Sequence, residues 1–140
     1  MQDPSIQERV LTELDHARLV SLMARLTASG KLDDAAEAAY DLLDSVLTVP
    51  APAIAPDVVT MRSRIRLRGQ DGQDLDLTLA YPDEADAGSG RISVLSPLGL
   101  SLIGCHKGQQ IQWHGPDRSV RRGMVADIPY QPEAAGDYGT

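Results

Sequence analysis

The chain has 140 residues and a mass of 15.0 kDa, which suffices for one ordinary domain or two small parts and excludes a large multidomain enzyme. Only 4% of its residues are aromatic, and none is Phe, so the composition argues against a deep aromatic ligand pocket. A single Cys excludes an internal disulfide.

The net charge of −7 is unevenly distributed along the chain. Residues 1–48 carry nine acids and four Lys or Arg, whereas residues 49–140 carry eleven acids and nine bases. Such a chain has no basic surface for free nucleic acid, whose binding depends on neutralising phosphates. The acidic first third suits a protein partner or a metal ion better.

The location in the cell can be argued from what the chain lacks. The first residues have neither the basic nor the apolar region of a secretory signal, and no apolar run approaches the length of a membrane span. A single Cys is also typical of a reducing compartment. We therefore expect a soluble, cytoplasmic protein that does not bind membranes.

Residues 1–48 show the apolar periodicity of two helices. The first helix can begin at Asp3-Pro4 or at Ser5, and would run for about 24 residues, or about 36 Å, up to Ser29-Gly30-Lys31. The second begins near Asp33 and lasts about 15 residues, or about 22 Å. So short a connection predicts an antiparallel helical hairpin, a short coiled coil. The charged residues expected to face water on the first helix are Glu8, Arg9, Glu13, Asp15, Arg18 and Arg25.

Residues 49–56 contain three prolines and are predicted to be an extended linker between two parts. Beyond them the apolar period changes from 3.6 to 2, as in β-strands. Residues 130–140, rich in Pro, Gly and small side chains, are expected to form a surface tail. The sequence therefore predicts an α+β protein, with a helical hairpin over 1–48 and an antiparallel β domain with one short helix over 57–140.

The first two strands of the β domain are joined by a turn whose register can be derived. A two-residue Asp71-Gly72 turn would pair Arg68 with Leu75 and place a charge on the core face. A three-residue turn, with Gly72 in the left-handed region, instead pairs Arg68 with Asp74 and Arg66 with Asp76. We predict this second register.

Within residues 92–104, a residue pattern typical of a β-strand is followed directly by one typical of a capped helix. Ser96 offers an N-cap oxygen, and Pro97 occupies the first helical position. Gly104 can end the helix in a left-handed conformation. The pattern predicts a strand, a cap and a short apolar helix that pack on one another in the core. Its core residues are Ile92, Val94, Leu98, Leu102 and Ile103.

The tip of the helical hairpin holds the acids Asp33, Asp34 and Glu37. They could bind a divalent cation, because hard cations prefer charged oxygen ligands. They could equally cap the second helix, with Asp34 as N-cap and Glu37 three residues later, both favoured by the helix dipole. The two interpretations are compatible.

Four arginines, at positions 62, 64, 66 and 68, alternate along one face of the first strand. They could form a basic docking face for an acidic partner, with Arg62 and Arg64 as the candidate contact residues. Pairing with Asp74 and Asp76 explains the other two without a partner.

No residue pattern points to catalysis. Cys105-His106 lacks a third residue to complete a nucleophilic site, and one Cys with three scattered His does not make a zinc site. The glycine spacing of 99–104 resembles a phosphate loop, but Cys105 stands where the lysine is needed. We predict no catalytic residue, no intrinsic metal and no cofactor.

The order of these elements resembles the Gre-type transcript-cleavage factors, a family that binds bacterial RNA polymerase. The likeness is carried by Gly90-Arg91-Ile92-Ser93, followed by a motif comprising Ser96, Pro97, Leu98, Gly99, Leu102, Gly104 and Gly108. Residues 57–64 and 130–138 are similar to a branch of this family whose members bind the polymerase and compete with Gre factors without cleaving RNA.

The resemblance implies an FKBP-like fold for residues 57–140, docked on the rim of the polymerase secondary channel, with the hairpin projecting inward. In Gre factors an Asp and a Glu three residues later, at the tip, help to hold the second catalytic metal, and Asp34 and Glu37 reproduce this spacing. Two features depart from the Gre pattern: the hairpin is shorter, and Tyr40 has a different offset from Glu37.

Three hypotheses follow from the sequence and the resemblance. The first is a monomeric, non-enzymatic regulator that binds bacterial RNA polymerase at the secondary channel. The second is an active transcript-cleavage factor that uses Asp34 and Glu37. The third is an FKBP-type prolyl isomerase, suggested by the implied fold alone, for which the domain offers few aromatic residues.

Overall fold

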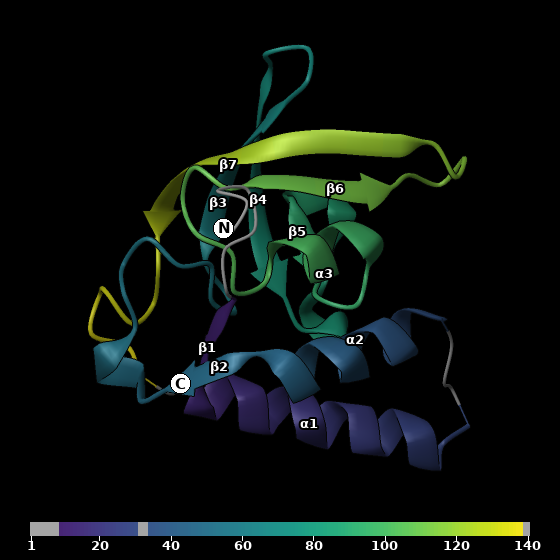
Figure 1. Cartoon of the computed structure of the whole chain (residues 1–140), viewed down its shortest axis with the longest axis vertical. Helices are drawn as coiled ribbons and strands as arrows, with labels where there is room; N and C mark the ends of the chain where they lie inside the picture. Colours follow the sequence, from purple (N-terminus) through teal and green to yellow (C-terminus); the bar gives the residue numbers. More distant parts are fainter. Residues whose placement is uncertain (1–8, 31–33, 139–140) are drawn as a thin grey trace, which may run out of the picture.

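The computed structural model describes residues 9–30 and 34–138. It confirms an α+β protein, in which the helices α1 and α2 lie side by side beneath a curled sheet (Figure 1). Among the described residues, no helix is long and apolar enough to cross a membrane. The elements in chain order are β1 (Val10–Thr12), α1 (Glu13–Ala28), α2 (Asp34–Ser45), β2 (Leu47–Val49), η1 (Ala51–Ala53), β3 (Arg64–Gly69), β4 (Asp74–Ala80), η2 (Pro82–Glu84), η3 (Ala87–Ser89), β5 (Arg91–Ser93), α3 (Pro97–Leu102), β6 (Gln110–His114) and β7 (Val120–Tyr130).

The first helix is shorter than predicted. It begins at Glu13, because the Thr12 hydroxyl caps it by accepting a hydrogen bond from the Asp15 amide at 3.0 Å. The predicted helix was wrong for residues 10–12, which form β1, and its expected starts at Asp3-Pro4 or Ser5 lie outside the described residues. With 16 residues, α1 is about 24 Å long.

The base of the hairpin is closed by a short ladder that the sequence did not suggest. β1 pairs in parallel with β2, Val10 opposite Leu47 and Thr12 opposite Val49. The segment 47–49 therefore extends the hairpin as a strand after α2 ends at Ser45. Both helices are tied together at the end where they join the rest of the molecule.

The main sheet has five strands in the order β5-β4-β3-β7-β6. It is mixed, whereas we predicted an antiparallel domain, because β5 runs parallel to β4. Residues 81–90, with η2 and η3, carry the chain back so that β5 lies beside the last three residues of β4, Thr78 to Ala80.

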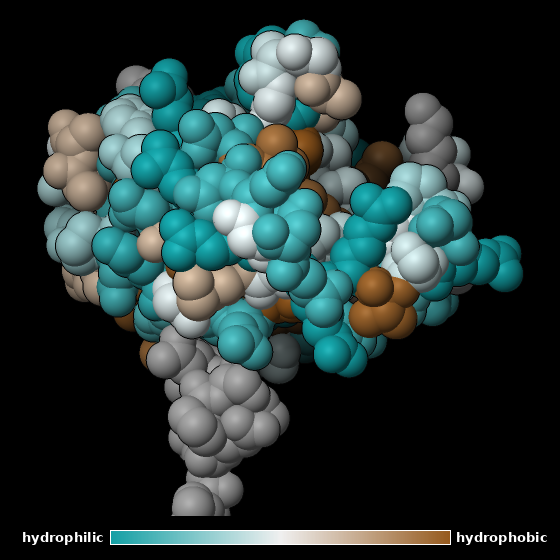
Figure 2. Space-filling view, turned by 90° about the horizontal axis from the view of Figure 1, so that it is seen from above, coloured by the Kyte–Doolittle hydropathy of each residue, from teal (hydrophilic) through white to brown (hydrophobic). Residues whose placement is uncertain are grey.

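Seen from above in Figure 2, the surface is mainly hydrophilic, with small separate hydrophobic patches.

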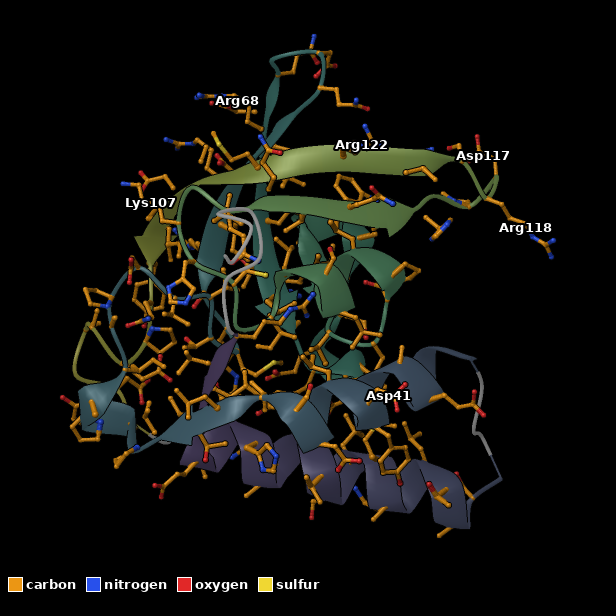
Figure 3. The ribbon with its side chains drawn as sticks, viewed as in Figure 1. Asp41, Arg68, Lys107, Asp117, Arg118 and Arg122 are labelled. Carbon is orange, nitrogen blue, oxygen red and sulfur yellow. The ribbon has the colours of Figure 1, made fainter. Side chains whose placement is uncertain are left out.

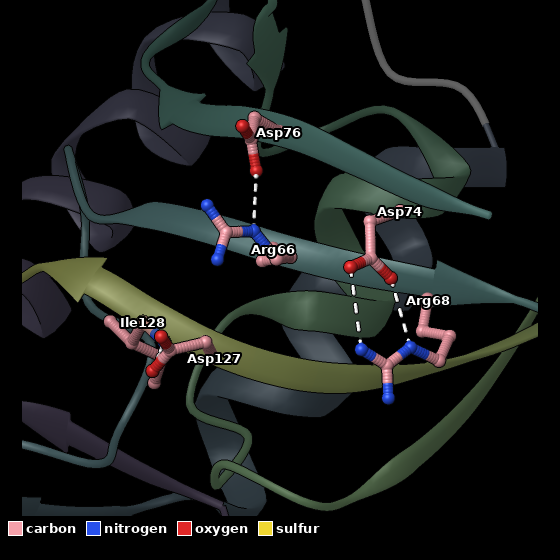
Figure 4. A network of polar contacts seen from close by, with 6 residues as sticks. All are labelled: Arg66, Arg68, Asp74, Asp76, Asp127 and Ile128. Carbon is pink, nitrogen blue, oxygen red and sulfur yellow. Dashed lines mark hydrogen bonds and ion pairs between the residues drawn. The ribbon is translucent and has the colours of Figure 1, made fainter. Parts of the chain in front are cut away.

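The predicted register of the β3–β4 hairpin is confirmed. Arg66 lies opposite Asp76 and Arg68 opposite Asp74, and Gly72 has a φ of 79°. The arginines reach these partners at 3.1 and 2.9 Å (Figure 4). One prediction is wrong here: Leu75, expected in the core, is 55% exposed. The tip of the β3–β4 hairpin extends beyond the elements that could cover this side chain (Figure 1).

The predicted strand, cap and helix of residues 92–104 are also confirmed. The Ser96 hydroxyl accepts a hydrogen bond from the Gly99 amide at 3.1 Å, Pro97 opens α3, and Gly104 has a φ of 79°. α3 approaches β5 so closely that a Cβ atom at Gly99 would lie 2.0 Å from the Ser93 carbonyl oxygen. Glycine is required at this contact.

One hydrophobic core joins the hairpin to the sheet. Leu19 and Met23 of α1 and Leu43 of α2 belong to the same buried cluster as Val94 and Ile103. The helices therefore pack along the β5–α3 side of the sheet instead of standing apart from it. This packing fixes the direction in which the hairpin points.

Gly99→Ala is expected to destabilise the protein by at least about 2 kcal/mol, because the new methyl group overlaps the backbone of residue 93. The measurement is urea unfolding followed by circular dichroism. Gly88→Ala is the matched control, since its Cβ would have an ordinary contact of 3.4 Å; its free energy of unfolding should change by less than about 0.5 kcal/mol. Equal effects of the two substitutions would contradict the close contact.

Candidate functional site

The motif at residues 96–104, which the family resemblance marks as belonging to a polymerase-docking domain, surrounds α3, and most of it is structural. Gly99, Leu102 and Gly104 are buried, and their roles are close packing and the helix end. Ser96 caps the helix. Pro97 is exposed and Leu98 half-buried, so these two side chains are the part of the motif that a partner could touch.

Arg62 is held in a constrained position just before β3. Its φ of 67° lies in the left-handed region, where a side chain costs about 1–2 kcal/mol. The guanidinium binds both oxygens of Glu84 at 3.2 and 3.0 Å and lies 5.5 Å from the centre of the Tyr81 ring. The bond to Glu84 raises the pKa of Arg62.

The four arginines do not form one continuous basic face. Arg66 and Arg68 are paired with Asp76 and Asp74, and Arg62 with Glu84. Arg64 is exposed and has no ion pair within the described residues. The interpretation as paired surface charges therefore holds for three of the four positions.

The hairpin tip is only partly described. Asp33 lies outside the described residues, Asp34 is the first residue of α2, and Glu37 is exposed. One turn further, the Tyr40 hydroxyl is 2.8 Å from that of Thr27, which joins the two helices near the tip. In the described part of the chain, no three His, Cys, Asp or Glu residues are placed to hold a metal ion.

A buried acid at the base of the hairpin was missed by the sequence reasoning. Asp15, expected to face water, is only 5% exposed, and its carboxylate accepts a hydrogen bond from the Met61 amide at 3.1 Å. Burial raises the pKa of Asp15 to about 6. Thr12 and Asp15 have the spacing of a capping box, which marks the helix start but does not reveal that the acid is buried.

The C-terminal tail is anchored at the same place. Gln131, expected on the surface, is 3% exposed, and its side-chain NH₂ donates to the carbonyl oxygens of Ala55 and Val58, both at 2.8 Å. The Thr60 hydroxyl donates to Glu133 at 2.7 Å. A cavity of about 190 Å³ lies between the tail and the hairpin base.

We define the junction as this meeting of the hairpin base, residues 60–62 and the tail. Its cavity is lined by Leu14, Asp15, Arg18, Met61, Arg62, Tyr81, Tyr130, Pro132, Glu133, Asp137 and Tyr138. The segments 57–64 and 130–138, which the sequence singled out separately, thus come together here. Cys105 lies elsewhere, fully buried with its thiol donating to the Ser101 carbonyl, and burial raises its pKa.

Comparison with known proteins places this arrangement in a family. Residues 54–130, more than half of the chain, match the family described as "Transcription elongation factor, GreA/GreB, C-term". The chain belongs to the GreA/GreB family.

Relatives of the whole chain agree with this assignment. The protein named "Regulator of nucleoside diphosphate kinase" of Escherichia coli K12 is 34% identical over 139 residues, 99% of this chain and 98% of that one. The solved GreA/GreB structure from Nitrosomonas europaea superimposes with a TM-score of 0.73 at 30% identity, covering 88% of this chain and 100% of that chain. The GreA of Prosthecochloris aestuarii is 39% identical over 66 residues, only 41% of its length.

The residues that match the GreA/GreB family, 54–130, include the whole five-stranded sheet and α3. The helical hairpin lies outside this match, but the Escherichia coli relative, which aligns over 99% of this chain, includes it. The FKBP-like description of the β domain and the domain boundaries at residues 48 and 57 stay predictions.

Substitutions at Arg62 should separate its backbone strain from its side-chain contacts. Arg62→Ala and Arg62→Gly both remove the contacts with Glu84 and Tyr81, but only alanine keeps the cost of the left-handed conformation. We expect Arg62→Gly to be more stable than Arg62→Ala by about 1 kcal/mol. Urea unfolding checks this order, and a glycine variant no more stable than the alanine variant would show that the conformation carries no strain.

Proposed function

We propose that this chain is an RNA polymerase-binding transcription regulator that docks at the secondary channel and competes with Gre factors without cleaving RNA. Membership of the GreA/GreB family supports polymerase as the partner. The short hairpin, packed on the sheet, is the observation that favours a non-cleaving role. The proposal includes action as a cytoplasmic monomer, without a cofactor and without binding free nucleic acid.

The reach of the hairpin is limited by its own packing. Met23 is the last fully buried residue of α1, and the helix ends at Ala28, only about 8 Å further on. On α2, Ala39 and Leu43 are buried in the shared core. Most of the length of both helices therefore serves to attach the hairpin, and little is left to project toward a distant active site.

A second candidate function is an active cleavage factor that lends a metal to the polymerase. The spacing of Asp34 and Glu37 and the exposure of Glu37 favour it. Cleavage would require both acids to reach the polymerase active site from the end of the hairpin.

A backtracked elongation complex separates the two functions. Added to such a complex, the protein is expected to release no 3′ RNA fragments above the polymerase's own background. Fragments that vanish in Asp34→Ala but persist in Asp41→Ala would establish the second function in place of the first. Asp41 is the matched control, because it is an exposed acid on the same helix two turns away.

The docking surface can be tested at Pro97, the exposed residue of the α3 motif. Pro97→Asp removes an apolar contact, and an acid in the first helical turn keeps α3 stable. Affinity for core polymerase, measured by competition with a Gre factor, should fall at least about tenfold. Pro116→Asp, at another exposed proline in the β6–β7 turn, should bind as the parent protein does. Equal affinity of both variants would exclude this face as the docking surface.

A further inference from the structure

The face of the main sheet that points away from the core carries a groove, which we call the outer groove. Successive side chains of a strand point to opposite faces of a sheet. Because Leu67, Ile111 and Val125 point into the core, the side chains next to them along their strands lie on the outer face. A groove of about 580 Å³ is formed there, and its lining includes Arg68, Gln70, Gln110, Gln112, Arg122 and Met124.

The strand register fixes how these side chains are arranged. Met124 of β7 lies opposite both Arg68 of β3 and Gln110 of β6. Arg122, two residues before Met124 on the same strand, lies opposite Gln112. Arg122 is therefore a diagonal neighbour of Arg68 across the antiparallel β3–β7 pair, and residues in this relation lie about 7–8 Å apart, within reach of long side chains.

The charged side chains that line the outer groove are both arginines, and both retain unused hydrogen-bond donors. Arg122 is exposed and forms no ion pair within the described residues. Arg68 donates to Asp74 through Nε and Nη2, and its third nitrogen, Nη1, is directed away from Asp74 (Figure 4). The groove therefore presents two positive groups that can bind oxygen anions.

We propose that the outer groove binds an extended acidic segment of a partner protein, in which two Asp or Glu residues are separated by a single residue. In an extended chain such acids point to the same face and lie about 6.7 Å apart, close to the diagonal spacing of Arg68 and Arg122. One carboxylate accepts hydrogen bonds from Arg122, and the other accepts one from Nη1 of Arg68. Hydrogen bonds between charged groups are about twice as strong as neutral ones.

The other side chains of the groove suit a peptide better than a nucleic acid. The amides of Gln70, Gln110 and Gln112 each offer donors and an acceptor, which match the N–H and C=O groups of a peptide main chain. Met124, half-buried between Arg68 and Gln110, provides an adaptable apolar contact. The lining contains no aromatic side chain on which a base could stack, as bases do in single-strand binding sites.

The outer groove lies on the opposite side of the sheet from the other surfaces of interest. α3, which carries Pro97, packs on the core face, where Leu102 and Ile111 share one buried cluster. The acidic helix α2 also lies beneath the sheet, so that Asp41 and the groove arginines are far apart in Figure 3. The groove is thus a second binding surface, open while α3 is occupied, and the proposal does not depend on polymerase docking.

A nuclear magnetic resonance titration of the full chain with two capped peptides of equal charge tests this recognition. Ser-Glu-Val-Glu-Ser is expected to shift the amides of residues 68–70, 110–112 and 122–124. Ser-Val-Glu-Glu-Ser should bind about fivefold more weakly, because adjacent acids in an extended chain point to opposite faces. Equal affinities of the two peptides, shifts confined to other residues, or no shifts at millimolar peptide would overturn the proposal.

Variants distinguish the outer groove from a general effect of charge. Arg122→Gln should weaken binding of Ser-Glu-Val-Glu-Ser by at least about fivefold. Arg118→Gln, the matched control, removes the same charge from the same ribbon outside the groove, and should change the affinity less than about twofold. Pro97→Asp should bind the peptide as the parent protein does. Equal losses at positions 118 and 122, or a loss in Pro97→Asp, would overturn the proposal.

A uridine trinucleotide, whose two phosphates match the charge of the peptides, tests the choice of a protein segment as the occupant. It should bind at least about fivefold more weakly than Ser-Glu-Val-Glu-Ser, because the groove offers no stacking surface. A trinucleotide that binds as tightly as the peptide and shifts the same amides would make the groove a nucleic-acid site and overturn the proposal.

Discussion

The shared core between the helical hairpin and the β5–α3 unit determines the rest of the structure. Met23 and Leu19 meet Val94 and Ile103 in one buried cluster, and burying such side chains stabilises each by about 1.5–3 kcal/mol. α3 can provide this surface only because Gly99 lets it lie directly against residue 93. The orientation of the hairpin is thus set by a backbone contact within the β domain, far from the hairpin tip.

Local patterns predicted the parts of this fold that depend on neighbouring residues. The register of β3 and β4 followed from charges that must face each other, and α3 from a cap, a proline and a glycine in sequence order. The parallel pairing of β1 with β2 and the burial of Asp15 depend on segments more than 30 residues apart. An apolar period cannot reveal them, because Val10 and Leu11 suit a helix and a strand equally well.

For the candidate site too, the sequence predicted some features and only the fold showed the others. Residues 57–64 and 130–138 carried a resemblance in sequence, but only the fold shows that they meet around Asp15 and Glu133. At the tip, capping and cation binding remain compatible for Asp34 and Glu37, because both use the same carboxylates at the same end of a helix.

The rigid attachment of the helical hairpin also couples its charge to the β domain. Glu37, Asp41 and Asp44 share one exposed face of α2, while Arg118 and Arg122 lie on the β6–β7 ribbon away from the hairpin (Figure 3). The acidic face of α2 and the arginines of the β6–β7 ribbon cannot reorient independently. The electrostatic field of the molecule therefore has a fixed direction relative to Pro97. A charged partner would therefore meet the protein in one preferred orientation, which favours specific docking even though each surface charge alone contributes little.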